Sequence, residues 1–139
     1  MSIRTIMLAG IAAVACVAAA AAHSPEEHSA ICSEAEARYV ELNGKPSSSE
    51  PQPVILMFKH TFCPAKLTVK QGTPVRFLNV DKRTSHSFWF RDAGRPESER
   101  YFQNEGAVMV MDLPPGDHEY LCGPHWEKEK MIGVISVTP

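Results

Sequence analysis

From Val54 to the C-terminus, short apolar segments alternate with Gly, Pro, Asn and Asp. The segments are rich in β-branched and aromatic residues, and several of them alternate apolar with polar positions, as strands with one buried face do. Many short strands separated by turn residues are typical of an all-β sandwich or barrel. We therefore expect a small all-β sandwich with seven strands, at VILMF (54–58), KLTVKQG (66–72), PVRFLNVD (74–81), HSFWF (86–90), AVMVMDL (107–113), HEYLC (118–122) and MIGVISV (131–137).

The segment before this region has a helical period instead. Ile31, Ala35 and Tyr39 follow one another at four-residue intervals, and Ser24 with acidic residues behind it is a typical helix start. These features predict a short amphipathic helix over 24–43. The sequence GKPSSSEPQP that follows has the composition of a linker.

The chain therefore divides into three parts. Residues 1–22 carry Arg4, then an apolar run composed mostly of Ala and Val, and end in small residues, which is the pattern of a secretory signal peptide. We expect an N-terminal helical extension with its linker at 23–52, and the compact domain at 53–139. A signal peptide predicts export to a periplasm, with no membrane insertion after cleavage.

Two other interpretations of the leader are weaker. A transmembrane anchor is disfavoured because the run is Ala-rich and no basic cluster follows it. Lipid attachment at Cys16 is disfavoured because Ala13 is not the bulky aliphatic residue usual at that position.

Charge and cysteine content limit the possible partners. The chain has 14 Lys and Arg, one of them Arg4 in the leader, against 16 Asp and Glu, so nothing indicates a nucleic-acid or anionic-lipid partner. Without Cys16, three cysteines remain in a compartment that permits disulfides. If Cys122 is held by a metal, Cys32 and Cys63 remain as a pair that would tie the extension to the domain.

The segment 119–133, EYLCGPHWEKEKMIG, contains a Cys, a His and a Met within ten residues. Two His, one Cys and a weak axial Met form a type I copper site, so Cys122, His125 and Met131 supply three of its four ligands. Candidates for the second histidine are His60, His86 and His118. His86 fits best, because it lies where a loop enters a predicted strand. A structural zinc site fits less well, since such sites use closely spaced Cys and His pairs.

The alternation of faces along the predicted strand before Cys122 indicates where His118 lies. His118 and Tyr120 share a face with Cys122. A hydrogen-bonded core histidine is the expected role of His118 on that face, and we expect His60 at the surface, outside the metal site.

Two long segments, at 62–88 and 114–137, resemble the cupredoxin family, the small type I copper proteins that include plastocyanin, pseudoazurin and amicyanin. The resemblance covers 53–138 and implies a Greek-key β-sandwich binding one copper ion through His86, Cys122, His125 and Met131. The residues that match the family pattern are Phe62, Pro64, Leu67, Val69, Gly72, Val75, Phe77, Asn79, His86, Pro115, Gly116, Tyr120, Cys122, His125, Met131 and Gly133.

The chain departs from the family at two points. His118 replaces an aromatic residue, and the spacer WEKEK between His125 and Met131 is one residue longer than in plastocyanin or pseudoazurin. Because the spacer is longer, the axial ligand could instead be a water molecule or a carboxylate such as Glu127 or Glu129, in place of Met131.

The resemblance also implies roles next to the ligands. Ser87 occupies a position where the family often ties its two ligand loops together, with a plain surface serine as the alternative. Trp126 would either join an apolar docking patch or shield the copper.

The resemblance implies a one-electron carrier, a monomer that exchanges electrons with a cytochrome c or a periplasmic oxidoreductase. An enzyme is not expected, because the H-x-H pairs typical of multicopper oxidases are missing from the sequence. The alternative is a copper-binding protein for tolerance, buffering or delivery, which His23 and His28 favour because they could bind a second copper.

Overall fold

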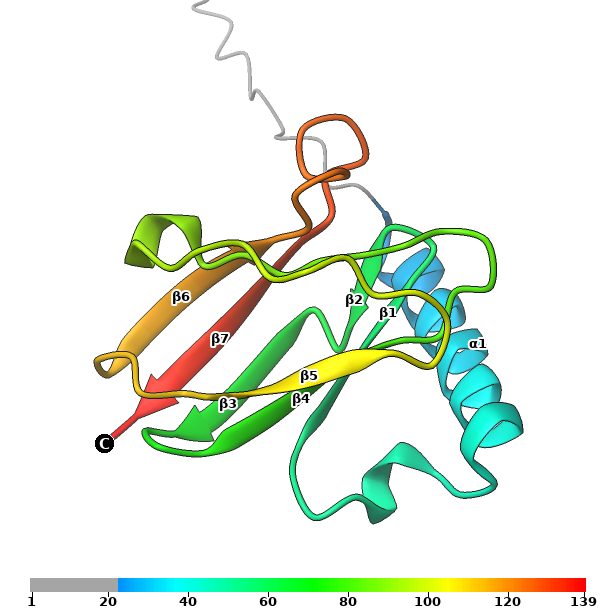
Figure 1. The fold of residues 1–139 in the computed structure, drawn as a ribbon, viewed down its shortest axis with the longest axis horizontal. Coiled ribbons are helices and arrows are strands. Elements are labelled where there is room, and N and C mark those ends of the chain that lie inside the picture. The colour runs from blue at the N-terminus through cyan, green and yellow to red at the C-terminus, as the bar shows by residue number, and fades with distance from the viewer. Residues whose placement is uncertain (1–22) are drawn as a thin grey trace, which may run out of the picture.

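The computed structural model describes residues 23–139, so the predicted signal peptide lies outside the described residues. Two sheets face each other in a sandwich, and a helix lies beside it (Figure 1). This confirms the expected all-β sandwich with an N-terminal helix. The elements are α1 (Pro25–Asn43), η1 (Ser47–Ser49), β1 (Val54–Phe58), β2 (Thr61–Cys63), β3 (Lys66–Lys70), β4 (Pro74–Asn79), η2 (Arg91–Ala93), β5 (Gly106–Val110), β6 (Gly116–Leu121) and β7 (Ile132–Thr138).

Both sheets are mixed. One has the order β2-β1-β4-β5, with β1 parallel to β4, and the other has the order β3-β7-β6, with β3 parallel to β7. The main core lies between them and includes the buried rings of Phe62, Phe77, Phe90 and Tyr120. Burial of such large apolar side chains is the dominant favourable contribution to folding.

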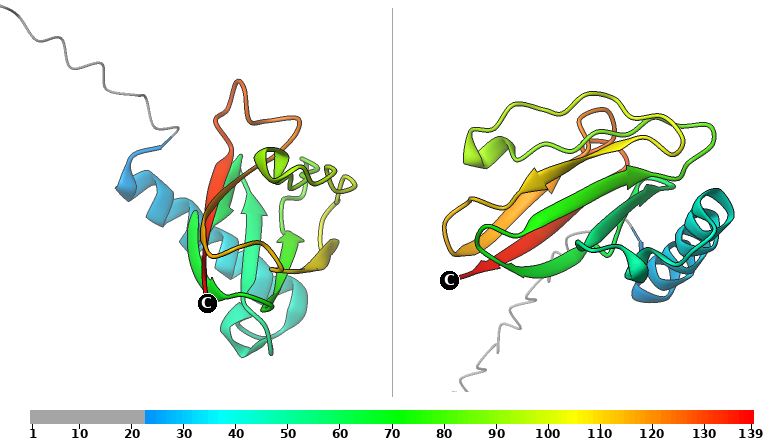
Figure 2. Two further views of the ribbon diagram at one scale, coloured as in Figure 1. Left: turned by 90° about the vertical axis from the view of Figure 1, so that its left-hand side faces the viewer. Right: turned by 60° about the horizontal axis from the view of Figure 1, so that its bottom comes forward.

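Strand β1 is apolar along its whole length because both of its faces are buried. Ile55 and Met57 point into the core between the sheets, whereas Leu56 and Phe58 belong to a second apolar cluster. This second cluster lies under the helix, which Figure 2 shows on the outside of the sandwich.

The helix begins as its sequence predicts. Ser24 is its N-cap, and a reciprocal pair of hydrogen bonds between Ser24 and Glu27 forms a capping box. Ala35 and Tyr39, two of the three residues in the predicted stripe, are fully buried against the sheet. No helix within residues 23–139 has the length and apolar character needed to cross a membrane.

The extension is joined to the domain by covalent and polar contacts. Cys32 of α1 and Cys63 of β2 form the expected disulfide, with a sequence separation of 31. The predicted linker is ordered around a short 3-10 helix, because Glu36 accepts hydrogen bonds from the backbone and the hydroxyl of Ser47. Helix, linker and sheet therefore form one packed unit.

One strand prediction was wrong, and one strand was missed. Residues 86–90 form no strand, only single bridges from His86 to Tyr101 and from Trp89 to Leu121. Phe88 and Phe90 are buried there without a continuous ladder, which explains the misleading apolar pattern. Strand β2 was missed because its three residues pair with β1 across a turn of only two residues, too short a pattern to recognise.

Candidate metal site

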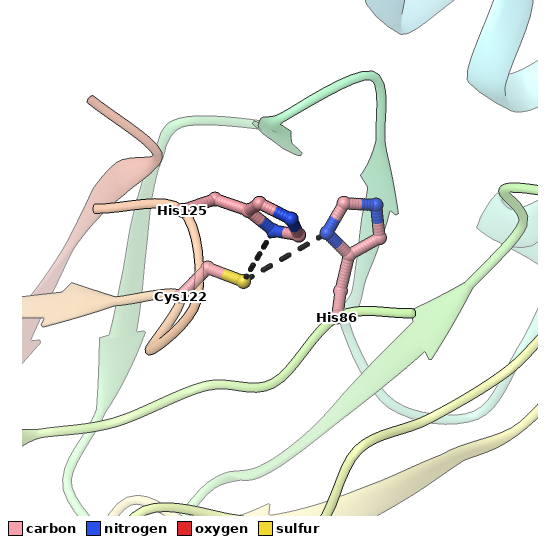
Figure 3. Close-up of side chains that lie close together, drawn as sticks. All are labelled: His86, Cys122 and His125. Atoms are coloured by element: carbon pink, nitrogen blue, oxygen red, sulfur yellow. Dashed lines mark hydrogen bonds between the residues drawn. The ribbon is translucent and has the colours of Figure 1, made fainter. Parts of the chain in front are cut away.

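Three side chains from two distant segments meet at one end of the sandwich. His86 lies in the long connection between β4 and β5, whereas Cys122 and His125 lie at the start of the loop between β6 and β7, which projects beyond the sheets in Figure 1. The Cys122 Sγ atom is 3.8 Å from His86 Nδ1 and 3.3 Å from His125 Nδ1 (Figure 3). One donor atom from each residue lies within 4.8 Å of the others, an arrangement that could hold a metal ion.

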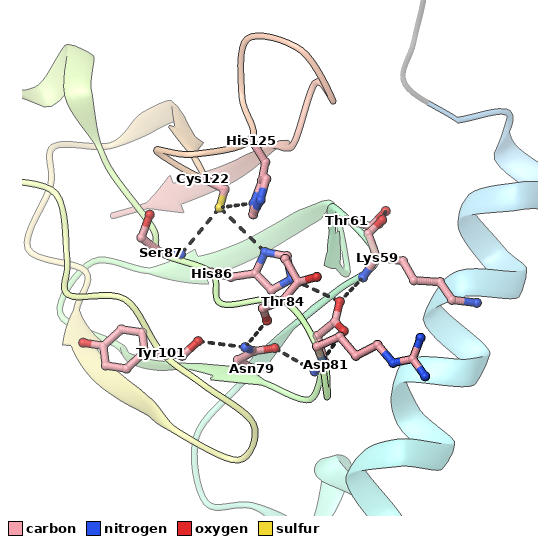
Figure 4. A network of polar contacts seen from close by, with 11 residues as sticks. Lys59, Thr61, Asn79, Asp81, Thr84, His86, Ser87, Tyr101, Cys122 and His125 are labelled. Carbon is pink, nitrogen blue, oxygen red and sulfur yellow. Dashed lines mark hydrogen bonds and ion pairs between the residues drawn. The ribbon is translucent and has the colours of Figure 1, made fainter.

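His86 is held by Asp81 (Figure 4). Its Nε2 lies 3.3 Å from Asp81 Oδ2, so the ring donates its proton there and its Nδ1 lone pair faces Cys122. Burial alone would raise the pKa of Asp81. Hydrogen bonds from the backbone N–H groups of Lys59 and Arg83, together with the contact to His86, hold that pKa below its usual value instead.

The loop that carries Asp81 and His86 is fixed by a buried amide. The Asn79 side chain donates to the carbonyl oxygens of Thr84 and Tyr101, and its Oδ1 accepts from the backbone N–H of Asp81. Asn79 is completely buried. It therefore links the end of β4 to the segment that presents His86.

Cys122 is completely buried at the end of β6. Its sulfur accepts a hydrogen bond from the backbone N–H of Ser87, at 3.5 Å. Two backbone hydrogen bonds keep the ligand loop compact, from His125 N–H to the Cys122 oxygen and from Cys122 N–H to the Met131 oxygen. A thiolate needs such donors when it is removed from water.

The electrostatics of the site favour neutral imidazoles. Burial lowers the pKa of His86 to about 4, although Asp81 opposes this effect. Burial, followed by the proximity of His60, lowers the pKa of His125. Burial raises the pKa of the Cys122 thiol, and hydrogen bonding from Ser87 partly offsets this rise. Near neutral pH both histidines can therefore act as lone-pair donors, and a metal would have to displace the thiol proton.

Met131 is buried in the same core cluster as Cys122 and Tyr120, and its backbone hydrogen bonds to both Cys122 and His125. Glu127 is exposed and Glu129 half-buried on the same loop. The burial of Met131 agrees with a soft axial ligand, and that role stays a prediction.

The other histidine candidates lie in different places. His60 occupies the two-residue turn between β1 and β2, and its ring centroid is 4.5 Å from that of His125 and 6.1 Å from that of His86. His60 is thus beside the site, closer than its sequence indicated. His118 lies outside the metal-ligating group, and its Nε2 hydrogen bonds to the Pro114 oxygen at 2.6 Å, as expected. It is only half-buried, however, so its predicted place in the core is wrong.

Ser87 and Trp126, the two residues predicted to lie next to the ligands, are both found there. Ser87, next to His86, is completely buried and makes two hydrogen bonds to the Cys122 loop, so the tie between the two ligand segments is present. Trp126 is half-buried, and the guanidinium of Arg91 lies 4.7 Å from its ring centroid. The same guanidinium lies 5.9 Å from the Trp89 ring. This cation–π contact fixes Trp126 at the edge of the His125 loop.

Comparison by sequence finds no match, either to protein-family models or to curated proteins. Comparison by structure finds many. Amicyanin from Paracoccus versutus superposes with a TM-score of 0.54 at 20% identity, covering 66% of this chain and 88% of amicyanin. A purple cupredoxin from Nitrosopumilus maritimus gives 0.51 at 17% identity, covering 63% of this chain and 100% of that protein.

A copper-containing nitrite reductase from Thermus scotoductus gives a TM-score of 0.53 at 21% identity. The match covers 69% of this chain but only 24% of the reductase, so the likeness concerns one part of a larger enzyme. Together these similarities show that the chain has the cupredoxin fold.

Proposed function

We propose that this protein with the cupredoxin fold binds one copper ion through His86, Cys122 and His125, with Met131 as axial ligand, and acts as a one-electron carrier. The observation that supports this proposal is the convergence of two imidazole nitrogens and one thiol sulfur within 4.8 Å of one another, with His86 and Cys122 completely buried. Imidazole nitrogens with a soft sulfur donor suit copper.

The protein's own groups would keep the ligands in place. When bound, copper supplies a one-electron couple. Asp81 orients His86, Ser87 donates to the Cys122 sulfur, and the backbone hydrogen bonds of Met131 close the loop. Ligands that are fixed by packed strands and by these hydrogen bonds need to move little when copper changes its oxidation state, which favours rapid electron exchange.

The half-buried His125 is the ligand nearest to the surface, whereas His86 and Cys122 are fully buried. A redox partner such as a cytochrome c or a periplasmic oxidoreductase would therefore approach on the side of His125 and Trp126, in a brief encounter with the monomer. The carrier would work in the periplasm without catalysing a reaction of its own. The leader pattern at 1–22 and the Cys32–Cys63 disulfide support that location.

The proposal is tested by titrating the purified protein with Cu(II) and recording the visible spectrum. We expect an intense thiolate-to-copper band that saturates at one copper per chain. The variants Cys122→Ala and His86→Ala should lose the band, whereas His118→Ala, a control histidine bound to Pro114, should keep it. Retention of the parent spectrum by Cys122→Ala would refute the assignment.

A second candidate function is copper handling, and one observation favours it. His23, His28 and His60 line a common pocket beside α1, and the buried Nε2 of His23 has no hydrogen-bond partner. Lys130 lines the same pocket and would oppose a cation there. Copper buffering predicts a second, weakly coloured copper that is lost in His28→Ala while the intense band remains. A stoichiometry of one copper in the parent protein would exclude this second site.

A further inference from the structure

The segment before β5 lies beside the segment that carries His86. His86 and Tyr101 exchange two backbone hydrogen bonds, and Ser98 N–H donates to the Phe88 oxygen at 3.0 Å. The Ser98 hydroxyl accepts from Phe88 N–H, also at 3.0 Å. This pairing places the side chain of Glu97 next to Ser87, a residue on which the proposed site depends.

Ser87 connects Glu97 to the Cys122 loop. Its hydroxyl donates to Glu97 Oε1 at 2.6 Å and accepts from the backbone N–H of Gly123 at 3.0 Å. Its own backbone N–H donates to Cys122 Sγ. Because a carboxylate accepts hydrogen bonds, Glu97 fixes the direction in which the Ser87 hydroxyl donates, which leaves the hydroxyl oxygen free to accept from Gly123.

Gly123, the residue directly after Cys122, is what allows the carboxylate to come so close. A Cβ atom at this position would lie 1.9 Å from Glu97 Oε1 and 2.4 Å from its Cδ. Any side chain here would push Glu97 away from Ser87. The contact between Glu97 and the buried Ser87 hydroxyl therefore depends on the absence of a side chain at Gly123.

A negative charge at this position has a definite electrostatic effect. One-electron reduction of the proposed site, with the electron taken from a redox partner, adds one negative charge beside Cys122. Glu97 opposes that addition and so favours the oxidised state. Arg100, in the same segment, acts in the opposite sense on Cys122 and His125.

We infer that Glu97 is a positioning residue of the metal site, which lowers its reduction potential by its charge and holds the Cys122 loop through Ser87. This inference rests on the proposed function. It assigns a role to a residue that contacts none of the proposed ligands directly and that no sequence pattern singled out.

The test separates charge from hydrogen bonding. Glu97→Gln removes the charge and keeps an acceptor, and Glu97→Ala removes both. Glu99→Gln is the matched control, because Glu99 is exposed like Glu97 but the structure shows no hydrogen bond from it to Ser87. We expect a more positive reduction potential in both Glu97 variants than in Glu99→Gln. Only Glu97→Ala should also speed amide hydrogen exchange at Gly123 in the apoprotein and release of copper from the loaded protein.

The possible failures differ from one another. If the intense band forms in all variants but Glu97→Gln and Glu99→Gln have the same potential, the charge role of Glu97 is wrong. If Gly123 exchanges equally fast in Glu97→Ala and in the parent apoprotein, the positioning role is wrong. If the parent protein itself develops no intense band with copper, both the proposed function and the role inferred for Glu97 are wrong.

Discussion

Asp81 accepts hydrogen bonds from His86 and from two backbone N–H groups next to the proposed site. Replacing it with Asn keeps the shape but presents an amide that no longer favours the proton on His86 Nε2. Loss of such a partner typically costs a factor of about 10 to 100 in metal affinity. We therefore predict that Asp81→Asn weakens copper binding by about that factor, as measured by competition with a chelator.

Asp117→Asn is the control for this substitution. Asp117 is exposed at the start of β6, where it accepts a hydrogen bond from Ser136, away from the ligands. Its replacement should leave the affinity for copper unchanged. Equal affinities of the Asp81 and Asp117 variants would contradict the role given to Asp81.

The lowered pKa of His86 predicts how the apoprotein responds to acid. Its pKa is about 4 in the folded state against an ordinary value of 6.5, so the unfolded state binds more protons between these values. The free energy of unfolding should therefore fall as the pH drops from 6.5 towards 4, by roughly 3 kcal/mol from this residue. His125 changes stability in the same direction.

Denaturant unfolding of the apoprotein at several pH values between 7 and 4 measures this effect. His86→Ala should reduce the pH dependence, whereas His118→Ala should leave it as in the parent protein. A parent apoprotein equally stable at pH 7 and pH 4.5 would show that His86 is not buried in its neutral form.

Helix α1 is attached to the sandwich by the disulfide and by the apolar cluster beneath it. The bridge closes a loop with a sequence separation of 31, and restricting the unfolded chain over that length stabilises by roughly 3–4 kcal/mol. We predict that the double variant Cys32→Ala/Cys63→Ala loses about this much stability in denaturant unfolding. Its intense copper band should remain, because the proposed ligands lie on other segments.

The turn between β1 and β2 shows why the helix matters to the site. Lys59 and His60 both have positive φ, at 46° and 55°, a conformation that Gly and Asn adopt more easily. Lys59 binds Glu34 of α1 through its side chain and Asp81 through its backbone, so helix, turn and His86 share one network. A loss of the copper band in the disulfide variant would mean that this network depends on the covalent link.

The sandwich should fold without metal. Its main core lies between two sheets that pair through five interstrand ladders, and only Cys122 and Met131 of the proposed ligands belong to that core. We predict that the apoprotein keeps the far-UV circular dichroism of the loaded form. Free copper at 100 times its Kd should stabilise the native state by about 2.7 kcal/mol and raise Tm. Loss of β-structure on copper removal would contradict this expectation.

Local patterns were sufficient to predict most of the architecture. Short apolar segments between turn residues predicted six of the seven strands that the structure contains, and the four-residue stripe with Ser24 predicted the helix, because these patterns follow from the backbone repeat and from burial. The spacing of Cys122 and His125, with His86 at a loop end, identified the group that the structure brings together, because donor chemistry depends on residue type. Once Cys122 is assigned to the metal, Cys32 and Cys63 are the two cysteines that remain to pair, as they do in the structure.

Contacts made by irregular loops were not predictable in this way. Asp81 and Glu97 are ordinary surface-type residues in the sequence. Their contacts with His86, five residues away, and with Ser87, ten residues away, depend on the path that the long connection between β4 and β5 takes. Likewise, His60 approaches His125 because the β1–β2 turn meets the opposite sheet's loop. Periodicity records which face of an element is buried, but the packing of elements alone determines which side chains meet.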